Sequence, residues 1–114
     1  MATANIILPT INRQASTDAR TVMDCYRAAP PQFVLTIETD YVGPTDTTGS
    51  CFRAEDTLHH SIHFEAAQYD LTTVENHLSA AIGLIQNCRF ATYQLLSYES
   101  TETGYQFSFA RLEG

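Results

Sequence analysis

The sequence contains no lysine, and this absence limits what its surface can bind. Thirteen Asp and Glu residues stand against six Arg residues, which gives a formal net charge of −7 at pH 7. Such a charge repels nucleic-acid phosphates and anionic lipid headgroups, so we expect neither direct nucleic-acid binding nor membrane binding. It would attract a basic protein partner. The alternative explanation is that the acidity only keeps the domain soluble.

Long apolar runs and closely paired cysteines are also missing, and we expect no leader segment. No segment approaches the roughly 20 consecutive apolar residues that cross a bilayer. Residues 1–9 have no basic region of the kind that begins a signal peptide, and we therefore predict a cytoplasmic protein. Cys25, Cys51 and Cys88 are widely spaced and form no C-x-x-C motif, so we expect neither a zinc ribbon nor a thioredoxin-type site.

Catalytic signatures are absent as well. The sequence has no G-x-S-x-G, no phosphate-binding loop, no G-x-G-x-x-G and no H-E-x-x-H. Nucleophilic catalysis needs a Ser or Cys beside a base and an oxyanion site, and no such set can be assembled from neighbouring residues. We therefore predict no catalytic residue, no cofactor and no metal.

What is present is the periodicity of one α+β domain, residues 1–114. The first helix follows a cap at Ser16 or Thr17 and ends before Pro30, because proline cannot continue a helix. Apolar alternation or clustering marks the predicted strands, which are 5–8, 33–42, 57–65, 89–98 and 105–109.

The second helix begins at a capping box, in which the Thr72 hydroxyl and the Glu75 carboxylate bond to each other's backbone amides. An apolar stripe then continues to Ile85. His77 lies off this stripe and is predicted to be exposed. Gly83 costs about 1 kcal/mol relative to alanine inside a helix, and such a glycine would allow the helix to approach the sheet closely.

This order of elements predicts a ferredoxin-like β-α-β-β-α-β fold with an added C-terminal strand. Its antiparallel sheet would carry two helices on one face. Thr36, Glu38, His59 and His63 would lie on the opposite, open face. If residues 5–8 are not a strand, the alternative is a duplicated helix–strand–strand unit with a four-stranded sheet. Bacterial secretion chaperones combine comparable elements in an acidic dimer, which is an analogy at the level of the fold.

A histidine cluster, His59, His60 and His63, is the most suggestive chemical feature. On a strand with ~3.3 Å rise per residue, His59 and His63 share a face but lie about 13 Å apart, and His60 points to the apolar side. A metal ion needs its ligand atoms at about 2 Å, so these rings cannot converge on one ion. The candidate ligand-binding residues are His59, His63, Glu65 and Glu38.

Residues 43–56 are predicted to form a long polar, acidic loop, which is either a binding loop or only a mobile surface segment. Tyrosines on the predicted strands suit the centre of a protein interface, although sheet packing is the alternative explanation for many of them. The candidate interface residues are Tyr41, Asp46, Tyr93 and Tyr98.

We therefore predict a small acidic, non-enzymatic protein-interaction module. It would be a homodimer, or would cap or regulate a protein partner, through the open sheet face and the 43–56 loop. One alternative is a ferredoxin-like small-molecule-binding protein or enzyme that uses His59 and His63. Another is an acidic inhibitor that competes for the nucleic-acid-binding groove of another protein.

Overall fold

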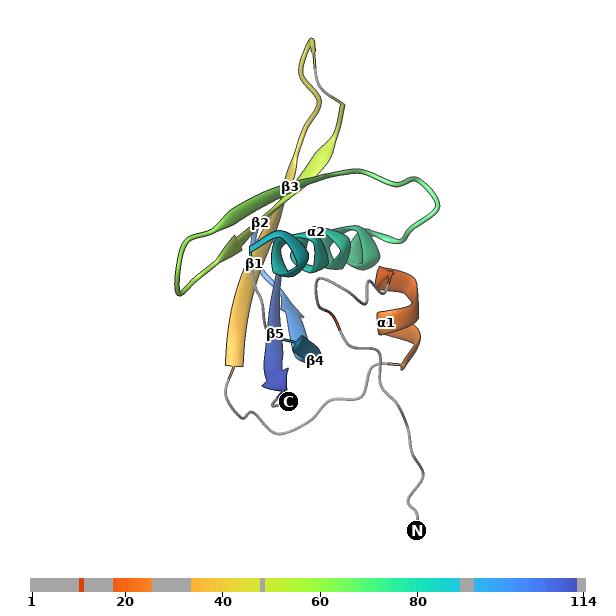
Figure 1. Ribbon diagram of the computed structural model, residues 1–114. Helices are drawn as coiled ribbons and strands as arrows, with labels where there is room; N and C mark the ends of the chain where they lie inside the picture. Colours follow the sequence, from red (N-terminus) through yellow and green to blue (C-terminus); the bar gives the residue numbers. More distant parts are fainter. Residues whose placement is uncertain (1–10, 12–17, 26–33, 48, 89–91, 113–114) are drawn as a thin grey trace.

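The computed structural model describes residues 11, 18–25, 34–47, 49–88 and 92–112. In these ranges the protein is an α+β structure with one antiparallel sheet, as predicted (Figure 1). Neither helix in the described ranges has the length and apolarity needed to span a membrane. The predicted strand at 5–8 lies outside the described residues. The elements are α1 (Ala19–Cys25), β1 (Val34–Val42), β2 (Cys51–Asp56), β3 (Ile62–Ala66), α2 (Thr73–Cys88), β4 (Thr92–Ser100) and β5 (Gly104–Leu112).

The strand order differs from the predicted ferredoxin-like arrangement. The five strands lie in the order β3-β2-β1-β5-β4, and every neighbouring pair is antiparallel. β1, β2 and β3 follow each other as hairpins and lie side by side. α2 then carries the chain to β4, and β5 returns beside β1. The alternative four-stranded duplication is also not found, because three strands precede α2.

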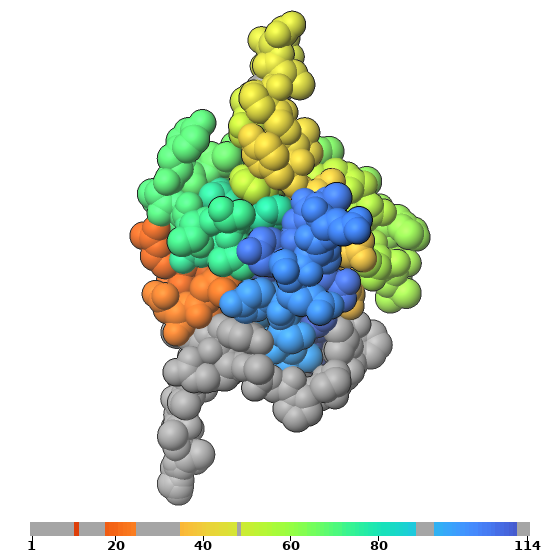
Figure 2. Space-filling model, turned by 180° about the vertical axis from the view of Figure 1, so that it is seen from behind, coloured from red at the N-terminus to blue at the C-terminus, as the bar shows by residue number. Residues whose placement is uncertain are grey.

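β2 corrects the prediction that all of 43–56 is a loop. Phe52, Ala54 and Asp56 are buried, whereas the residues between them are half-buried, so this segment alternates like a strand. What remains of the predicted loop is the connection between β1 and β2. We call residues 43–47, 49 and 50 the arm, because this segment projects from the body of the molecule in both views (Figures 1 and 2).

α2 lies across one face of the sheet, and the core fills the space between them (Figure 1). Leu35 and Ile37 of β1 point toward α2, as do Phe107 and Phe109 of β5, to which they are paired. The predicted alternation of β1 is thus confirmed, and Glu38 lies on the open face with Thr36. The pairings of β1 with β2, of β2 with β3 and of β5 with β4 continue this α2-facing side across the rest of the sheet.

The beginning of α2 is the predicted capping box. Thr72 N donates to Glu75 Oε1 at 2.9 Å, and Glu75 N donates to Thr72 Oγ1 at 3.2 Å. Gly83 lies directly over the sheet, which confirms the close approach that its position predicted. A β-carbon at residue 83 would stand 2.4 Å from Nε2 of His63, a separation that no real contact tolerates.

α1 packs against α2 rather than beside it on the sheet, so the prediction of two helices on one sheet face is only partly right (Figure 1). Its first turn is capped by Asp18, whose Oδ1 accepts a hydrogen bond from Thr21 N at 2.9 Å. This bond lowers the pKa of the Asp18 carboxyl. Ala19 and Val22 are buried, as their spacing predicted. The predicted caps at 16 and 17 lie outside the described residues.

Candidate functional site

His63 and Glu65 face α2, which corrects the prediction that His63 lies on the open face. β3 pairs with β2 so that His63 stands opposite the buried Ala54. Nε2 of His63 lies 2.8 Å from Glu65 Oε1, and Nδ1 lies 3.5 Å from Nδ2 of Asn87 on α2. The missing side chain of Gly83 makes room for this imidazole. His63 and Glu65 are therefore a half-buried polar pair on the edge strand, and His63 also contacts the helix through Asn87.

His59 and His60 lie in the turn between β2 and β3, not on a strand. His60 has a φ of 60°, and its ring is exposed, so the prediction that it is buried on the apolar side is wrong. Its Nδ1 lies 3.1 Å from Glu55 Oε2. This contact, followed by the Arg53 hydrogen bond to the same carboxylate, lowers the pKa of Glu55.

The four predicted ligand-binding residues thus do not converge. His63 and Glu65 touch each other on the α2 side, Glu38 lies on the open face, and His59 is exposed in the turn. Among the described residues, no group of three or more His, Cys, Asp or Glu side chains could hold a metal ion. This arrangement is not a site that could bind one small molecule through all four residues.

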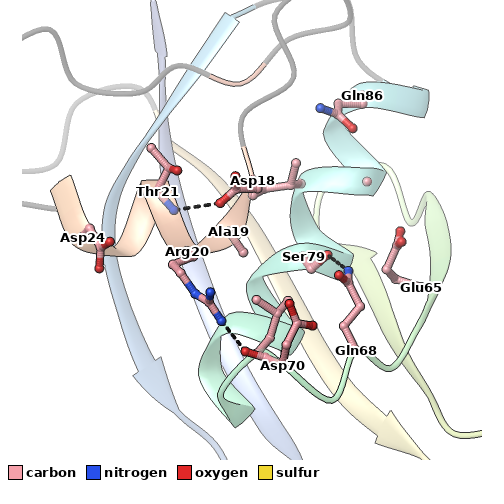
Figure 3. Close-up of a pocket in the computed structure, with 13 residues that line it drawn as sticks. Asp18, Ala19, Arg20, Thr21, Asp24, Glu65, Gln68, Asp70, Ser79 and Gln86 are labelled. Atoms are coloured by element: carbon pink, nitrogen blue, oxygen red, sulfur yellow. Dashed lines mark hydrogen bonds between the residues drawn. The ribbon is translucent and has the colours of Figure 1, made fainter.

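A polar pocket of about 530 Å³ lies between α1 and α2 (Figure 3). Arg20 donates to the backbone carbonyl of Asp70, and Nε2 of Gln68 donates to Ser79 Oγ at 3.5 Å. An amide cannot accept the proton of an attacking hydroxyl, so the contact between Gln68 and Ser79 does not activate a nucleophile. Besides Arg20, the charged side chains that line the pocket are Asp18, Asp24, Glu65 and Asp70, so its lining favours cations over anions.

His77 is buried in the core, where the sequence predicted an exposed residue. Its side chain points into the sheet, and the residue is only 3% exposed. The Thr39 hydroxyl donates to the Tyr105 carbonyl at 3.2 Å, which leaves its oxygen to accept from Nδ1 of His77 at 2.8 Å. The ring packs against Phe52 at 4.6 Å between centroids. Burial lowers the pKa of His77, while Asp40 raises it in smaller measure, and the imidazole serves the core as a neutral group.

The four predicted interface residues do not form one surface. Tyr41 is exposed at the base of the arm, and its hydroxyl lies 2.8 Å from Ser50 Oγ. Asp46 is exposed on the arm itself. Tyr98 is partly exposed on the α2 side of the sheet. Tyr93 is 6% exposed, which leaves little of its ring for a partner.

β3 forms one edge of the sheet, and its backbone groups can be assigned to the inner or outer side. Asp56 N donates to Ser61 O at 3.0 Å, and Ala67 N donates to Ser50 O at 3.1 Å. In an antiparallel ladder, residues bonded to the neighbouring strand alternate with residues whose N–H and C=O groups point away from it. The outward-pointing backbone groups therefore belong to Ile62, Phe64 and Ala66. In the described part of the chain, no strand pairs with this side.

The same three residues place their side chains on the open face. Phe64 is 56% exposed and Ile62 is 46% exposed, and Ala66 is exposed beside them. Proteins usually guard an exposed edge with outward charges, prolines or bulges. The five residues of β3 contain no proline, and their charged side chain, Glu65, points toward α2. We call the outward backbone groups and side chains of Ile62, Phe64 and Ala66 the β3 edge.

An apolar hollow of about 500 Å³ adjoins the β3 edge. Phe64 and Ala66 form one wall, and the half-buried Val42 and Cys51 extend the apolar surface toward the arm. The arm residues that complete the hollow are Gly43, Thr45, Gly49 and Ser50. Edge and hollow together make a continuous surface that offers both unpaired backbone groups and apolar side chains.

The opposite edge of the sheet is occupied at one point. Ile11 forms a bridge to Tyr93 of β4, with Ile11 N donating to Tyr93 O at 2.9 Å and Tyr93 N donating to Ile11 O at 3.0 Å. Ile11 is itself fully buried. The two edges therefore differ within the described residues, because β4 is bridged at Tyr93 and β3 carries no such bridge.

Comparisons with protein-family models, with curated proteins and with solved structures give no match.

The β3 edge was missed from the sequence because its apolar residues were assigned to the core. Ile62 and Phe64 alternate with His63 and Glu65, and the apolar set of such a strand usually faces inward. Gly83 predicted the close approach of α2 to the sheet, but it did not indicate which side chains of the sheet would lie beneath it.

Proposed function

We propose that this protein is a non-enzymatic protein-interaction module whose β3 edge binds an extended segment of a protein chain by adding it to the sheet. Strand addition uses main-chain hydrogen bonds for affinity and pockets for alternate side chains for specificity. The observation that supports the proposal is the exposure of Phe64 on an unguarded edge strand whose backbone groups at 62, 64 and 66 point outward.

The chemistry of the surface suits this role. An added strand would form hydrogen bonds with three residues of β3, each worth about 1 kcal/mol net. Covering the exposed ring of Phe64 would add up to about 1.5–3 kcal/mol. The hollow beside Phe64 could receive one apolar side chain of the bound segment, and the net charge of −7 on the protein disfavours acidic segments.

Ligand binding by His59 and His63 has less support. His59 is exposed in the turn, whereas His63 is held under α2 by Glu65 and Asn87. Competition for a nucleic-acid-binding groove would use the negative charge alone, and that charge does not account for the apolar β3 edge.

The proposal is tested by selecting binding peptides from a displayed random library, with the protein immobilised at low density. We expect enrichment of peptides with alternating apolar residues, and at least about tenfold weaker binding to the variant Ala66→Pro, because proline removes one outward N–H. Proline is tolerated on an edge strand where its missing N–H faces solvent, so the fold should persist.

The matched control is Leu58→Ser, which removes an exposed apolar side chain from the turn beside β3. It should leave binding unchanged, whereas Phe64→Ser should weaken it. Equal binding by Ala66→Pro and the unchanged protein, with both folded by circular dichroism, would contradict strand addition at this edge.

A further inference from the structure

We propose that the strand added to the β3 edge is β3 of a second copy of this chain, so that two sheets join into one across a two-fold axis at Phe64. The inference rests on the proposed function, because it names the partner of that same edge. It follows from three features of β3: the direction of its backbone groups, the residues on its open face and the charges on its α2 face.

The backbone groups fit a pairing centred on Phe64. In that antiparallel register, Phe64 faces Phe64 of the second copy and Ile62 faces Ala66 of the second copy. These are the residues whose N–H and C=O groups point outward. Each facing pair can therefore exchange two hydrogen bonds, as the bonded pairs of an antiparallel ladder do. A two-fold axis places the same surface on both sides of the interface, as is usual for protein dimers.

The side chains on the open face are also self-complementary. Ile62, Phe64 and Ala66 are all apolar, and all three are exposed. The pairing places the two phenylalanine rings side by side and an isoleucine next to an alanine at each end. A large residue thus meets a small one on either side of the central pair, and the exposed apolar side chains of the two copies come into contact with each other.

The α2 face fixes the register. With Phe64 at the axis, His63 faces Glu65 of the second copy and Glu65 faces His63, so unlike groups meet at both positions. Shifting the pairing by one outward-pointing residue in either direction would put His63 opposite His63 or Glu65 opposite Glu65. A Glu65–Glu65 pair would place like charges directly across from each other, which destabilises a strand pair. Among these registers, the one centred on Phe64 is the one that places an imidazole opposite a carboxylate at both positions.

These features favour a second copy over an unrelated segment. An unrelated segment needs only a strand with apolar residues at alternate positions, whereas here each position of β3 complements the position that symmetry brings opposite to it. The two copies carry the same net charge, −7 each, and their repulsion acts against association at long range. Salt should therefore strengthen the dimer by screening this repulsion.

Two experiments on the full chain measure the oligomeric state and the register of the paired strands separately. Sedimentation velocity across a concentration series should give a dimer that dissociates on dilution. Ala66→Pro should weaken the dimer about tenfold or more, because symmetry removes two hydrogen bonds at once. Leu58→Ser should leave it unchanged. A sedimentation coefficient that stays monomeric up to about 1 mM in the unchanged protein would overturn the proposal.

The register is tested by disulfide trapping in a background in which Cys25, Cys51 and Cys88 are replaced by serine. A mixture of Ile62→Cys and Ala66→Cys chains, distinguished by tags, should form a mixed cross-linked dimer under mild oxidation. Facing residues of a hydrogen-bonded pair have Cα atoms about 5.5 Å apart, which a disulfide can span. Ile62→Cys alone should cross-link poorly, because its two copies would lie about 13 Å apart along the strands at ~3.3 Å per residue.

The outcomes separate the two proposals. A dimer that shows no preference for the mixed 62–66 cross-link uses another surface, and the second-copy proposal fails. A monomer that still selects peptides in a manner sensitive to Ala66→Pro disproves the second-copy proposal and leaves the proposed function standing. A monomer that selects no peptides disproves both.

Discussion

The imidazole of His63 occupies the space in which a β-carbon on residue 83 would stand. Nε2 of His63 is 2.4 Å from that position, and Oε1 of Glu65 is 2.9 Å from it. A residue of the helix and two residues of the edge strand thus depend on one another, because the polar pair of β3 can turn toward the helix only where the helix has no side chain. This relationship also determines that Ile62 and Phe64 face outward.

The first prediction concerns Gly83→Ala. Alanine favours a helix over glycine by about 1 kcal/mol, yet we expect the substitution to destabilise the protein by about 1–3 kcal/mol, because the added methyl group would displace His63 and Glu65. Urea unfolding followed by circular dichroism measures the change. Gly49→Ala is the control, since a β-carbon there meets nothing within 4 Å. An increase in the free energy of unfolding for Gly83→Ala would show that the ring moves aside at no cost.

The second prediction tests the contact between the two residues directly. If the methyl group at 83 destabilises by displacing the imidazole, Gly83→Ala should cost less in a chain that also carries His63→Ala. The difference is the interaction energy of a double-mutant cycle, which for contacting residues is about 0.5–3 kcal/mol. Additive effects of the two substitutions would contradict the contact.

The third prediction is a dependence of stability on pH that arises from His77. Burial lowers the pKa of His77 in the folded protein, so at pH values below about 6.5 the unfolded chain takes up a proton that the folded chain resists. Stability should therefore be unaffected by His77 above that pH and should fall as the pH decreases below it, until the folded pKa is reached.

The measurement for His77 compares the unchanged protein with His77→Gln at pH 7.5 and pH 5.5. Carboxylates titrate in both proteins, and so the difference between the two slopes isolates the histidine. The unchanged protein should lose more stability than the variant between these pH values. Equal losses would mean that the folded core accepts the imidazolium.

The fourth prediction concerns the left-handed backbone at His60, where φ is 60°. A β-branched residue is strained at such a φ, so His60→Val should destabilise the protein by about 1–3 kcal/mol. His60→Gly should be nearly neutral, because glycine adopts this conformation without strain. Thermal unfolding of the two variants side by side checks the order, and a valine variant as stable as the glycine variant would contradict the positive φ.

The fifth prediction concerns the capping box. Thr72→Ala removes the oxygen that accepts the Glu75 amide hydrogen bond at 3.2 Å, and we expect a loss of about 1 kcal/mol in the free energy of unfolding. Thr73→Ala is the control, because Thr73 is exposed at the first position of α2. A loss as large for Thr73→Ala as for Thr72→Ala would mean that the effect is not capping.

The elements best predicted from the sequence are those in which one local signal acts alone. Alternation in β1 placed Leu35 and Ile37 inside, and the Thr72–Glu75 spacing marked the beginning of α2. β2 was missed because the glycine, proline and threonine residues before it are typical of a loop. The acidic residues within β2 are also common in loops, so the predicted loop was continued to residue 56. Phe52 and Ala54 did alternate with Arg53 and Glu55, but the buried Asp56 has no apolar side chain to complete the pattern.

The site could not be predicted because it depends on which face of an edge strand the helix covers. Apolar residues tend to be buried, but the rule does not work in reverse, and a strand can expose its apolar set when its polar set has partners inside. His63 has such partners in Glu65 and Asn87. Glu65 is two residues away on the same strand, but Asn87 lies 24 residues further along the chain on α2, so no local pattern contains the contact with the helix. The outward positions of Ile62 and Phe64 follow from the same contacts.

The bridge of Ile11 to Tyr93 has a consequence for assembly beyond two copies. A sheet can grow into a fibre when each of its two unlike edges accepts the other edge of the next molecule. Here β4 is bridged by Ile11 at Tyr93, and symmetric pairing of β3 with itself uses the β3 edge of both molecules at once. Association through β3 closes after a single step, so raising the protein concentration should fill the dimer, and this contact alone cannot produce filaments.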